Sequence, residues 1–218
     1  MVMFEVVAWN ARVDNNTHRG IFAIAQGIGP HVIGVTEVAR RTDAELSHPG
    51  YRLYRHGMRR AKVRGRTPEW RNSAVLVRRD VEVIRITWKV ERTPWRGPKA
   101  GVRHDPRVWP ELVIRVDGKA LKVAPALHFP FGDAQDDMAR NVARWMRRTL
   151  PRRAVLAVGD VNMKFSGWKR RVCDVARAVA IRGYGVDHGA VKRVNAASVT
   201  RFPRYGSDHF AMRYRVWL

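Results

Sequence analysis

The feature that most constrains the fold is an apolar run that ends in polar, oxygen-bearing side chains. Residues 154–158 read Ala-Val-Leu-Ala-Val and are followed by Gly159-Asp160-Val161-Asn162. Consecutive aliphatic residues bounded by a glycine predict a strand that is buried on both faces. Open α/β sheets commonly place their chemistry where such a strand ends. We therefore expect Asp160 and Asn162 to lie in a functional site, with a divalent metal and a phosphate between them and the other polar motifs.

Two strands near the start of the chain repeat this pattern. Residues 4–9 predict a strand that ends at Asn10, and residues 31–36 predict a second strand that ends at Glu37. Between them, Thr17 is a candidate helix cap, apolar residues follow at helical spacing, and Gly29-Pro30 stop the helix. A strand, helix, strand order allows the two strands to be parallel. Asn10 and Glu37 are then expected at the same edge of one sheet.

The remaining segments predict a mixed α and β chain. Strands are expected over 51–56, 73–78, 81–90, 111–116, 119–129, 189–194 and 210–218, and helices over 133–150 and 168–182. Asp117-Gly118 is a strong turn signal between two of the strands, and the second of these carries His128 near its end. The four prolines within residues 93–110 predict a long ordered loop without regular structure. No repeat or linker divides the chain, so we expect a single domain over residues 1–218.

The charge balance favours a polyanionic partner. Lysine and arginine together number 42 against 19 acidic residues, which gives a formal net charge of +23, and most of these cations are arginine. Such a field attracts nucleic acid or another polyphosphate. The single cysteine, Cys173, excludes an intrachain disulfide and favours a cytoplasmic setting. No apolar run reaches the roughly 20 residues of a membrane span. We expect a monomer with no membrane partner.

One basic segment interleaves cations with an aromatic side chain. It predicts a loop that follows a polynucleotide backbone, although a merely solvated loop is an equal alternative. The residues concerned are Arg59, Arg60, Lys62, Arg64, Arg66, Trp70 and Arg71. Trp95, Trp109 and Trp168 are also expected in loops or at a helix start, where stacking on bases is an option.

Several polar residues have the chemistry that phosphodiester hydrolysis requires. A hard cation must neutralise developing negative charge, and a base must prepare water for attack. Magnesium prefers oxygen ligands, so Glu37, Asp160 and Asp208 are candidates, with the amide oxygen of Asn10 beside them. A histidine held by a carboxylate is the usual general base. Asp187 with His209 is the candidate pair.

Six short motifs together resemble the endonuclease/exonuclease/phosphatase superfamily, the DNase I-like group. They occur in the family's order and approximate spacing across nearly the whole chain. The motifs are Trp9-Asn10, Thr36-Glu37-Val38, Leu127-His128-Phe129-Pro130, Gly159-Asp160-Val161-Asn162, Val186-Asp187-His188 and Ser207-Asp208-His209. The glutamine that often precedes the metal-binding glutamate in this family is Thr36 here.

The resemblance implies a fold and a set of roles. The fold is an α/β (α+β) four-layered αββα sandwich, in which two mixed β-sheets pack face to face with helices outside. The activity is hydrolysis assisted by Mg²⁺ or Mn²⁺. Asn10, Glu37 and Asp208 resemble metal-site residues, and His128 the histidine that donates to the scissile phosphate. Asp160 and Asn162 resemble the pair that orients water and phosphate, and Asp187 and His209 the carboxylate and its base.

These observations lead to one leading hypothesis and two alternatives. The leading hypothesis is a metal-dependent nuclease that hydrolyses DNA, or RNA, by attack of water. The first alternative keeps the site but takes inositol phosphates or phospholipids as substrates. The second is a non-catalytic nucleic-acid-binding protein. The intact set of candidate ligands argues against this last reading.

Overall fold

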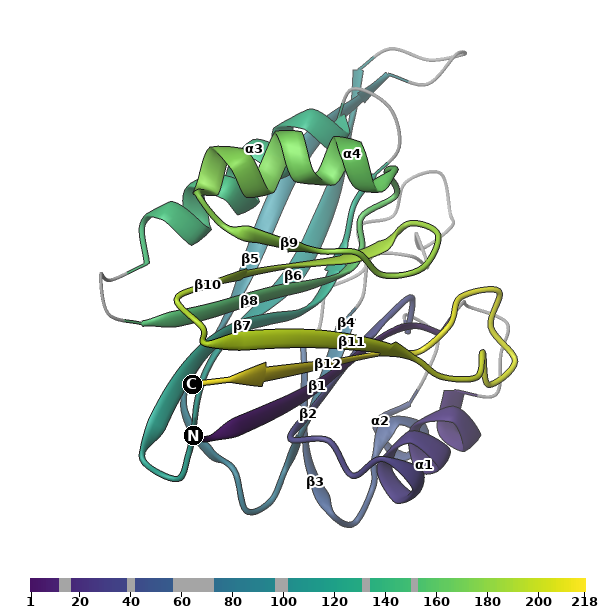
Figure 1. Ribbon diagram of the computed structural model, residues 1–218. Coiled ribbons are helices and arrows are strands. Elements are labelled where there is room, and N and C mark those ends of the chain that lie inside the picture. Colours follow the sequence, from purple (N-terminus) through teal and green to yellow (C-terminus); the bar gives the residue numbers. More distant parts are fainter. Residues whose placement is uncertain (12–16, 39–41, 57–72, 97–101, 131–133, 150–152) are drawn as a thin grey trace.

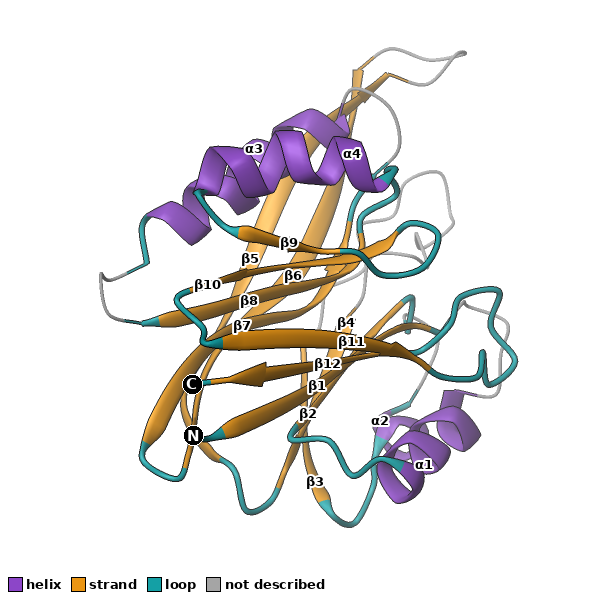
Figure 2. Cartoon of the chain, viewed as in Figure 1, coloured by secondary structure: helices purple, strands orange, loops and turns teal. Residues whose placement is uncertain are grey.

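Two mixed β-sheets lie face to face, and helices cover the outer side of each (Figure 1). The computed structural model describes residues 1–11, 17–38, 42–56, 73–96, 102–130, 134–149 and 153–218. The four layers follow the order helices, sheet, sheet, helices, and the two chain termini lie close together (Figure 2). The predicted four-layered sandwich is therefore confirmed.

The first sheet contains six strands and is covered by two helices. In spatial order the strands are β11 (Ala196–Arg201), β12 (Met212–Trp217), β1 (Met3–Asn10), β2 (Val32–Thr36), β4 (Ser73–Arg78) and β3 (Tyr51–Arg55). The helices are α1 (Thr17–Gly27) and α2 (Asp43–Leu46). β1 and β2 are parallel, and Asn10 pairs with Thr36 at the end of their ladder. This confirms the arrangement expected from the strand, helix, strand order.

The second sheet also contains six strands. In spatial order they are β5 (Glu82–Arg96), β6 (Val102–Val116), β7 (Lys119–His128), β8 (Ala154–Asp160), β10 (Asp187–Lys192) and β9 (Val179–Ile181). Its outer helices are α3 (Ala134–Arg147), α4 (Phe165–Trp168) and the π-helical turn η2 (Lys169–Asp174). β7 and β8 are parallel, whereas β10 is antiparallel to β8. None of the helices in these described ranges is long and apolar enough to cross a membrane.

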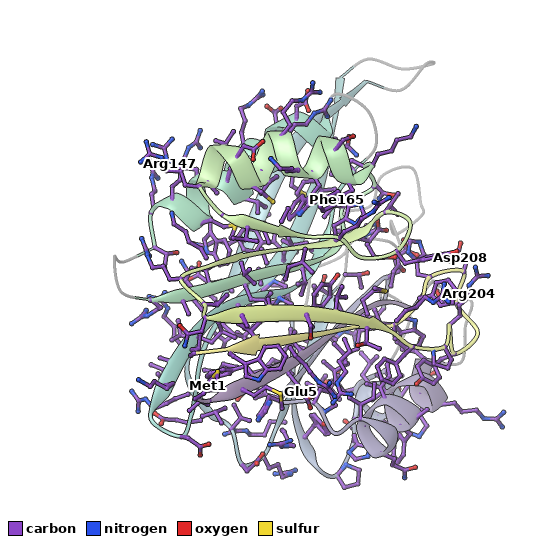
Figure 3. All side chains as sticks on the ribbon, viewed as in Figure 1. Met1, Glu5, Arg147, Phe165, Arg204 and Asp208 are labelled. Atoms are coloured by element: carbon purple, nitrogen blue, oxygen red, sulfur yellow. The ribbon has the colours of Figure 1, made fainter. Side chains whose placement is uncertain are left out.

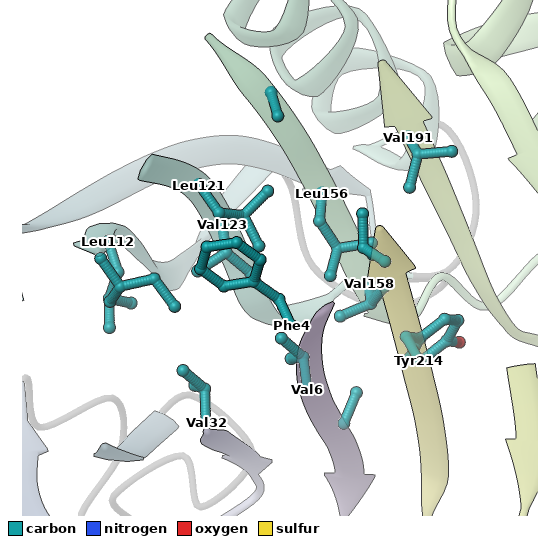
Figure 4. Close-up of a cluster of buried hydrophobic side chains, with 14 of the residues drawn as sticks. Phe4, Val6, Val32, Leu112, Leu121, Val123, Leu156, Val158, Val191 and Tyr214 are labelled. Carbon is teal, nitrogen blue, oxygen red and sulfur yellow. The ribbon is translucent and has the colours of Figure 1, made fainter. Parts of the chain in front are cut away.

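Each central strand is buried on both faces because it is covered by a sheet on one side and a helix on the other. Phe4 and Val6 of β1 lie in the cluster between the sheets together with Leu156 and Val158 of β8, and the Phe4 ring lies beside Val123 of β7 (Figure 4). The alternate residue Val7 packs instead in the cluster that includes residues of α1. β8 divides its side chains in the same way between the central cluster and α3. This two-sided burial explains the uninterrupted apolar runs.

The two sheets approach most closely beside the ends of β2 and β7. A Cβ atom on Gly34 would lie 2.0 Å from the carbonyl oxygen of Pro125 in the opposite sheet. Gly159 has φ +148°, and a Cβ atom there would lie 2.2 Å from the carbonyl oxygen of Leu127. The register of β7 against β8 shifts between Ala124 and Leu127, which is a β-bulge. A bulge changes the direction of the side chains that follow it. Here it directly precedes His128.

The proline-rich segment is not a loop, contrary to our expectation. β5 and β6 pair along their whole length, with Pro110 opposite Trp88, Pro106 opposite Arg92 and His104 opposite Pro94. Along the ladder, hydrogen-bonded and non-hydrogen-bonded residue pairs alternate. The three pairs that contain a proline are separated by an even number of residues, so all three are of the same kind. In an antiparallel ladder, alternate residues direct their N–H groups away from the partner strand. A proline at such a position on an outer ribbon removes no ladder hydrogen bond.

The helix expected over 168–182 ends early. Arg177 takes the left-handed φ of 54°. The amide of Arg177 donates to Asp174 O and that of Ala178 to Cys173 O, and this pair of bonds is a Schellman motif. The chain then forms β9, which we did not anticipate, and β11 was not anticipated either. Glycine usually marks this motif, and an arginine in its place conceals the helix end.

Two tryptophans considered for base stacking are core residues. Trp109 is 1% exposed and Trp168 is fully buried. Trp168 also donates its indole N–H to Gly189 O at 2.8 Å. Neither ring is accessible to a base. Trp70 and Asp133, the first residue of the helix expected over 133–150, lie outside the described residues, as does the side chain of Trp95.

His31 gives the stability a defined pH dependence. Its buried Nδ1 accepts the backbone N–H of Glu5 at 2.9 Å. Burial lowers the pKa of His31, and the charge of Arg78 lowers it further. The unfolded chain therefore accepts a proton more readily than the folded one. The stability contribution is fully present above about pH 6.5 and is lost as the pH falls toward the lower folded-state pKa.

We predict that the wild-type free energy of unfolding falls more steeply between about pH 7 and about pH 5 than that of a His31→Asn variant, by up to about 1.4 kcal/mol per pH unit. The asparagine keeps a hydrogen-bond acceptor but cannot take up a proton. Urea unfolding curves at several pH values measure the difference. Equal pH slopes for the two proteins would show that His31 does not contribute.

Candidate active site

The predicted site residues meet at one edge of the two sheets. Asn10 ends β1, Glu37 follows β2, His128 ends β7 and Asp160 ends β8. Asp187 begins the antiparallel strand β10 and pairs with Asp160. The turn that carries Asp208 lies at this same edge, on the right of Figure 3. Segments far apart in the sequence therefore supply one site.

Asn10 bridges two carboxylates from different elements. Its Nδ2 donates to Glu37 Oε1 at 3.2 Å and to Asp160 Oδ2 at 3.1 Å. His128 Nε2 lies 3.4 Å from the same Glu37 oxygen and 3.8 Å from Asp160 Oδ2. Glu37 has φ 61°, a left-handed conformation that costs energy for a residue with a side chain. Strain of this kind clusters at functional sites.

The turn after β8 is held rigidly. Asp160 Oδ1 accepts the backbone N–H of Asn162 at 3.0 Å. The side-chain amide of Asn162 donates to Phe129 O at 2.7 Å, and this residue has φ 50°. Gln135 of α3 donates to the carbonyl oxygen of Asn162 at 2.6 Å. Sequence reasoning missed Gln135, because a glutamine in a first helical turn carries no signal of a distant contact.

His209 is held between two aspartates. Its Nδ1 lies 3.1 Å from Asp187 Oδ2, and its Nε2 lies 3.8 Å from Asp160 Oδ2. The backbone N–H of His209 donates to Ser207 Oγ at 3.1 Å, and Ser207 Oγ donates to Asn10 O at 2.6 Å. Ser207 therefore ties this turn to the end of β1. Ser207 belongs to the Ser207-Asp208-His209 motif, but the motif alone did not predict its contact with Asn10.

Burial and charge shift the proton affinities of this group. Burial raises the pKa of Asp160 to about 6, and the negative charge of Asp187 adds to the rise. Burial by itself would lower the pKa of His209. The hydrogen bond to Asp187 and the charges of Asp187, Asp160 and Asp208 outweigh it and raise that pKa to about 9. The aspartates around His209 therefore favour its imidazolium form.

The donor set fits a hard divalent cation. Asp160, Asp187 and His209 each offer a ligand atom, and these atoms lie within 4.8 Å of one another. Glu37 adds a carboxylate on the other side of Asp160, bridged by the amide of Asn10. The raised pKa of Asp160 shows a buried carboxylate whose charge is incompletely compensated. Oxygen-rich, negatively charged sites of this type suit Mg²⁺ or Mn²⁺.

Not every predicted residue joins this group. Asp208 is exposed and accepts a hydrogen bond from Ser207 Oγ at 3.4 Å, and it is absent from the three-residue ligand group. The predicted nucleic-acid-binding residues of segment 59–71 lie outside the described residues. Their predicted part in binding stays a prediction.

An aromatic and arginine cluster, which we call the Tyr184 cluster, borders the site. It consists of Tyr184, Arg201, Arg204 and Phe210. The rings of Tyr184 and Phe210 meet edge to face at 4.8 Å. Arg201 lies 4.7 Å and 4.6 Å from these two rings, and Arg204 lies 4.5 Å from Phe210. Tyr184 is 48% exposed, and Phe210 directly follows His209. The four residues come from three separate segments, so the sequence did not reveal the cluster.

Comparisons with known proteins identify the fold. No protein-family profile matches the sequence, and no curated protein matches it either. Solved structures do match. An endonuclease/exonuclease/phosphatase protein from Bacteroides vulgatus aligns over 100% of both chains with a TM-score of 0.72 and 13% identity. Truncated TDP2 from Caenorhabditis elegans covers 99% of this chain and 98% of its own, with a TM-score of 0.70 and 15% identity.

A third similar structure is TDP2 from D. rerio complexed with a single-strand DNA product. It covers 100% of both chains with a TM-score of 0.66 and 12% identity. The chain therefore has the endonuclease/exonuclease/phosphatase, or DNase I-like, fold. The resemblance drawn from the six sequence motifs is confirmed at the level of the fold.

We predict that Asp187→Asn lowers the pKa of His209 from about 9 by about one unit or more. The substitution keeps a hydrogen-bond partner but removes the negative charge that favours the imidazolium. Histidine ring signals in an NMR pH titration with EDTA measure the change. Asp208→Asn is the matched control and should shift the pKa less, because Asp208 makes the smallest contribution. A larger shift in the control would contradict this account.

Proposed function

We propose that this protein is a hydrolase of phosphoester bonds, and specifically a nuclease that cleaves DNA with Mg²⁺ or Mn²⁺. One observation carries the proposal. Side chains from five strand ends and one turn converge on a single point, with Asp160 Oδ2 within 3.8 Å of Asn10, His128 and His209. A purely structural edge has no need of five buried or half-buried ionisable groups in mutual contact.

The proposed roles follow from the contacts. Glu37 and Asn10 would hold the metal ion, with Asp208 as a further candidate ligand. A bound cation would neutralise charge that develops on the phosphate and lower the proton affinity of His209. Asp187 holds the His209 ring through Nδ1 and leaves Nε2 facing Asp160. This directs Nε2 to take a proton from an attacking water molecule.

The other residues position the substrate. Asp160 lies beside the Nε2 atom of His209, where it can orient the water molecule. Asn162 is fixed to the same turn by its bonds to Asp160 and Phe129. His128 offers an imidazole N–H to a phosphate oxygen, which stabilises the extra charge of the pentavalent transition state.

Nucleic acid is the substrate class that the surroundings favour. The net charge of +23 suits a polyanion. The Tyr184 cluster offers an exposed aromatic face together with arginine, a combination that suits bases and phosphates of a polynucleotide. One protein of the same fold has been seen with a single-strand DNA product. Inositol phosphates and phospholipids remain the alternative substrates, and they offer no base to stack on this face.

We predict that Asp160→Asn and His209→Ala each reduce hydrolysis by at least about 100-fold without loss of the folded state, since each removes a group that acts in proton transfer or water orientation. Cleavage of a supercoiled plasmid, an abasic oligonucleotide and an inositol phosphate with Mg²⁺, at one salt concentration, measures activity and separates the substrate classes. EDTA should stop the reaction.

The matched controls are Asp117→Asn and His18→Ala, which make the same substitutions at exposed positions outside the site. They should retain wild-type rates. Wild-type turnover by Asp160→Asn or His209→Ala would overturn the assignment of these residues. Binding to DNA without cleavage under any metal condition would favour the non-catalytic alternative.

We further predict that Tyr184→Ala lowers kcat/KM on single-stranded DNA by about 10-fold, the loss expected for one stacked base. The same variant should hydrolyse bis(p-nitrophenyl) phosphate at the wild-type rate, because this small diester does not reach the cluster. Tyr54→Ala, at a tyrosine in the sheet edge strand β3, is a control for loss of a ring elsewhere. An equal loss of kcat/KM on single-stranded DNA and on bis(p-nitrophenyl) phosphate would show that Tyr184 supports the structure of the site instead of binding a base.

A further inference from the structure

The outward face of α3 carries a row of arginines that the proposed active site does not use. Arg140, Arg144, Arg147 and Arg148 are all exposed. They recur every three or four residues, so they share one face of the helix. Together with Val175, they line an open hollow of about 520 Å³. We call this the α3 arginine face.

Most of these charges have no compensating carboxylate. Arg140 forms an ion pair with Asp137, and Arg144 donates to the neutral side chain of Asn141 at 3.1 Å. Within the described ranges, no carboxylate forms an ion pair with Arg144, Arg147 or Arg148. Arg144 and Arg147 lie in the last turn of α3, where the helix dipole favours cations and offsets part of their mutual repulsion. Their guanidinium groups are exposed and available to an anionic partner.

Neighbouring segments add positive charge instead of relieving it. Lys192 donates to Ala176 O and Arg193 to Thr149 O, so both cations lie at helix ends beside α3. Burial lowers the pKa of Lys192, and the charges of Arg193, Arg147 and Arg177 lower it further. Cations from α3, from the turn after η2 and from β10 thus accumulate in one region.

This region is separate from the active site. Gln135, in the first turn of α3, contacts Asn162 at the site edge. Arg147 lies twelve residues further along, which corresponds to about 18 Å of helix. Figure 3 shows Arg147 at the opposite end of the molecule from Asp208. A polyanion bound at the active-site edge would have to bend around the outer helices to reach the α3 arginine face.

We propose that the α3 arginine face is a second binding surface for nucleic acid, which it contacts through the phosphate backbone. Guanidinium groups match phosphate oxygens with two parallel hydrogen bonds. The hollow has no aromatic lining residue, so bases are not stacked there and the contact is independent of sequence. Arginines spaced along about two turns, from Arg140 to Arg148 just past the end of α3, present several donors to consecutive phosphates. The inference does not depend on the proposed hydrolysis.

Binding of a fluorescein-labelled DNA duplex in EDTA tests this proposal without cleavage. Fluorescence anisotropy over a range of salt concentrations compares the wild type with R144Q/R147Q/R148Q. We expect the triple variant to bind at least about 10-fold more weakly, with the slope of log K against log salt reduced by about 2 to 3, the number of lost phosphate contacts. R144K/R147K/R148K should keep most of the salt slope, since it keeps the charges.

The matched control is R79Q/R115Q/K119Q, which removes the same number of exposed charges from the β4–β5 turn and from the ends of β6 and β7 opposite the active site, one of them (Arg115) paired with Glu82. Its salt slope should stay near the wild-type value. Thermal unfolding should show that both glutamine variants remain folded. If the two glutamine variants lost DNA affinity equally, the loss would reflect only the lower net charge of the protein, and the proposal would be overturned. A loss of binding to phosphatidylserine vesicles but not to DNA would overturn it in favour of a membrane surface.

Discussion

The structure depends on the close packing of two sheets that must meet face to face at their functional edge. Gly34 permits this approach, because a larger side chain there would collide with the backbone of β7 in the opposite sheet. Gly159 permits the close pairing of β8 with β7 within the second sheet. The contact fixes the ends of β1 and β2 against those of β7 and β8. The apolar cluster between the sheets then supplies the driving force, since both inner faces are removed from water. The site geometry is a consequence of this packing.

The site concentrates negative charge in a strongly basic chain. Asp160 and Asp187 are buried side by side at the ends of paired strands. The amide of Asn10, the backbone N–H of Asn162 and the imidazole of His209 offset their mutual repulsion. A bound cation would offset it further. In the proposed function, the surrounding arginines would attract the polyanionic substrate, while the acids at the centre of the site would hold the metal ion.

Much of the fold was predictable because burial leaves a direct trace in the sequence. The strands β1, β2 and β8 are apolar throughout, since a sheet covers one face and a helix covers the other. The type of turn at Asp117-Gly118 was also predictable, because both residues take positive φ, as this dipeptide favours. The errors concern residues whose local signals are misleading. Prolines of β5 and β6 occupy the pairs that need no N–H, and Arg177 ends a helix where glycine is usual.

The sequence by itself determined which residues are available for chemistry, because polar side chains placed directly after apolar strands have few structural uses. This pattern predicted Asn10, Glu37, Asp160 and Asn162. The pairing of a carboxylate with a histidine predicted Asp187 and His209, and the family resemblance added His128. Only the tertiary structure decided how they are linked. The bridge through Asn10, the support from Gln135 and Ser207, and the exposure of Asp208 all depend on contacts between distant segments. The Tyr184 cluster and the α3 arginine face arise in the same way, since a surface is formed by neighbours in space that one-dimensional spacing does not show.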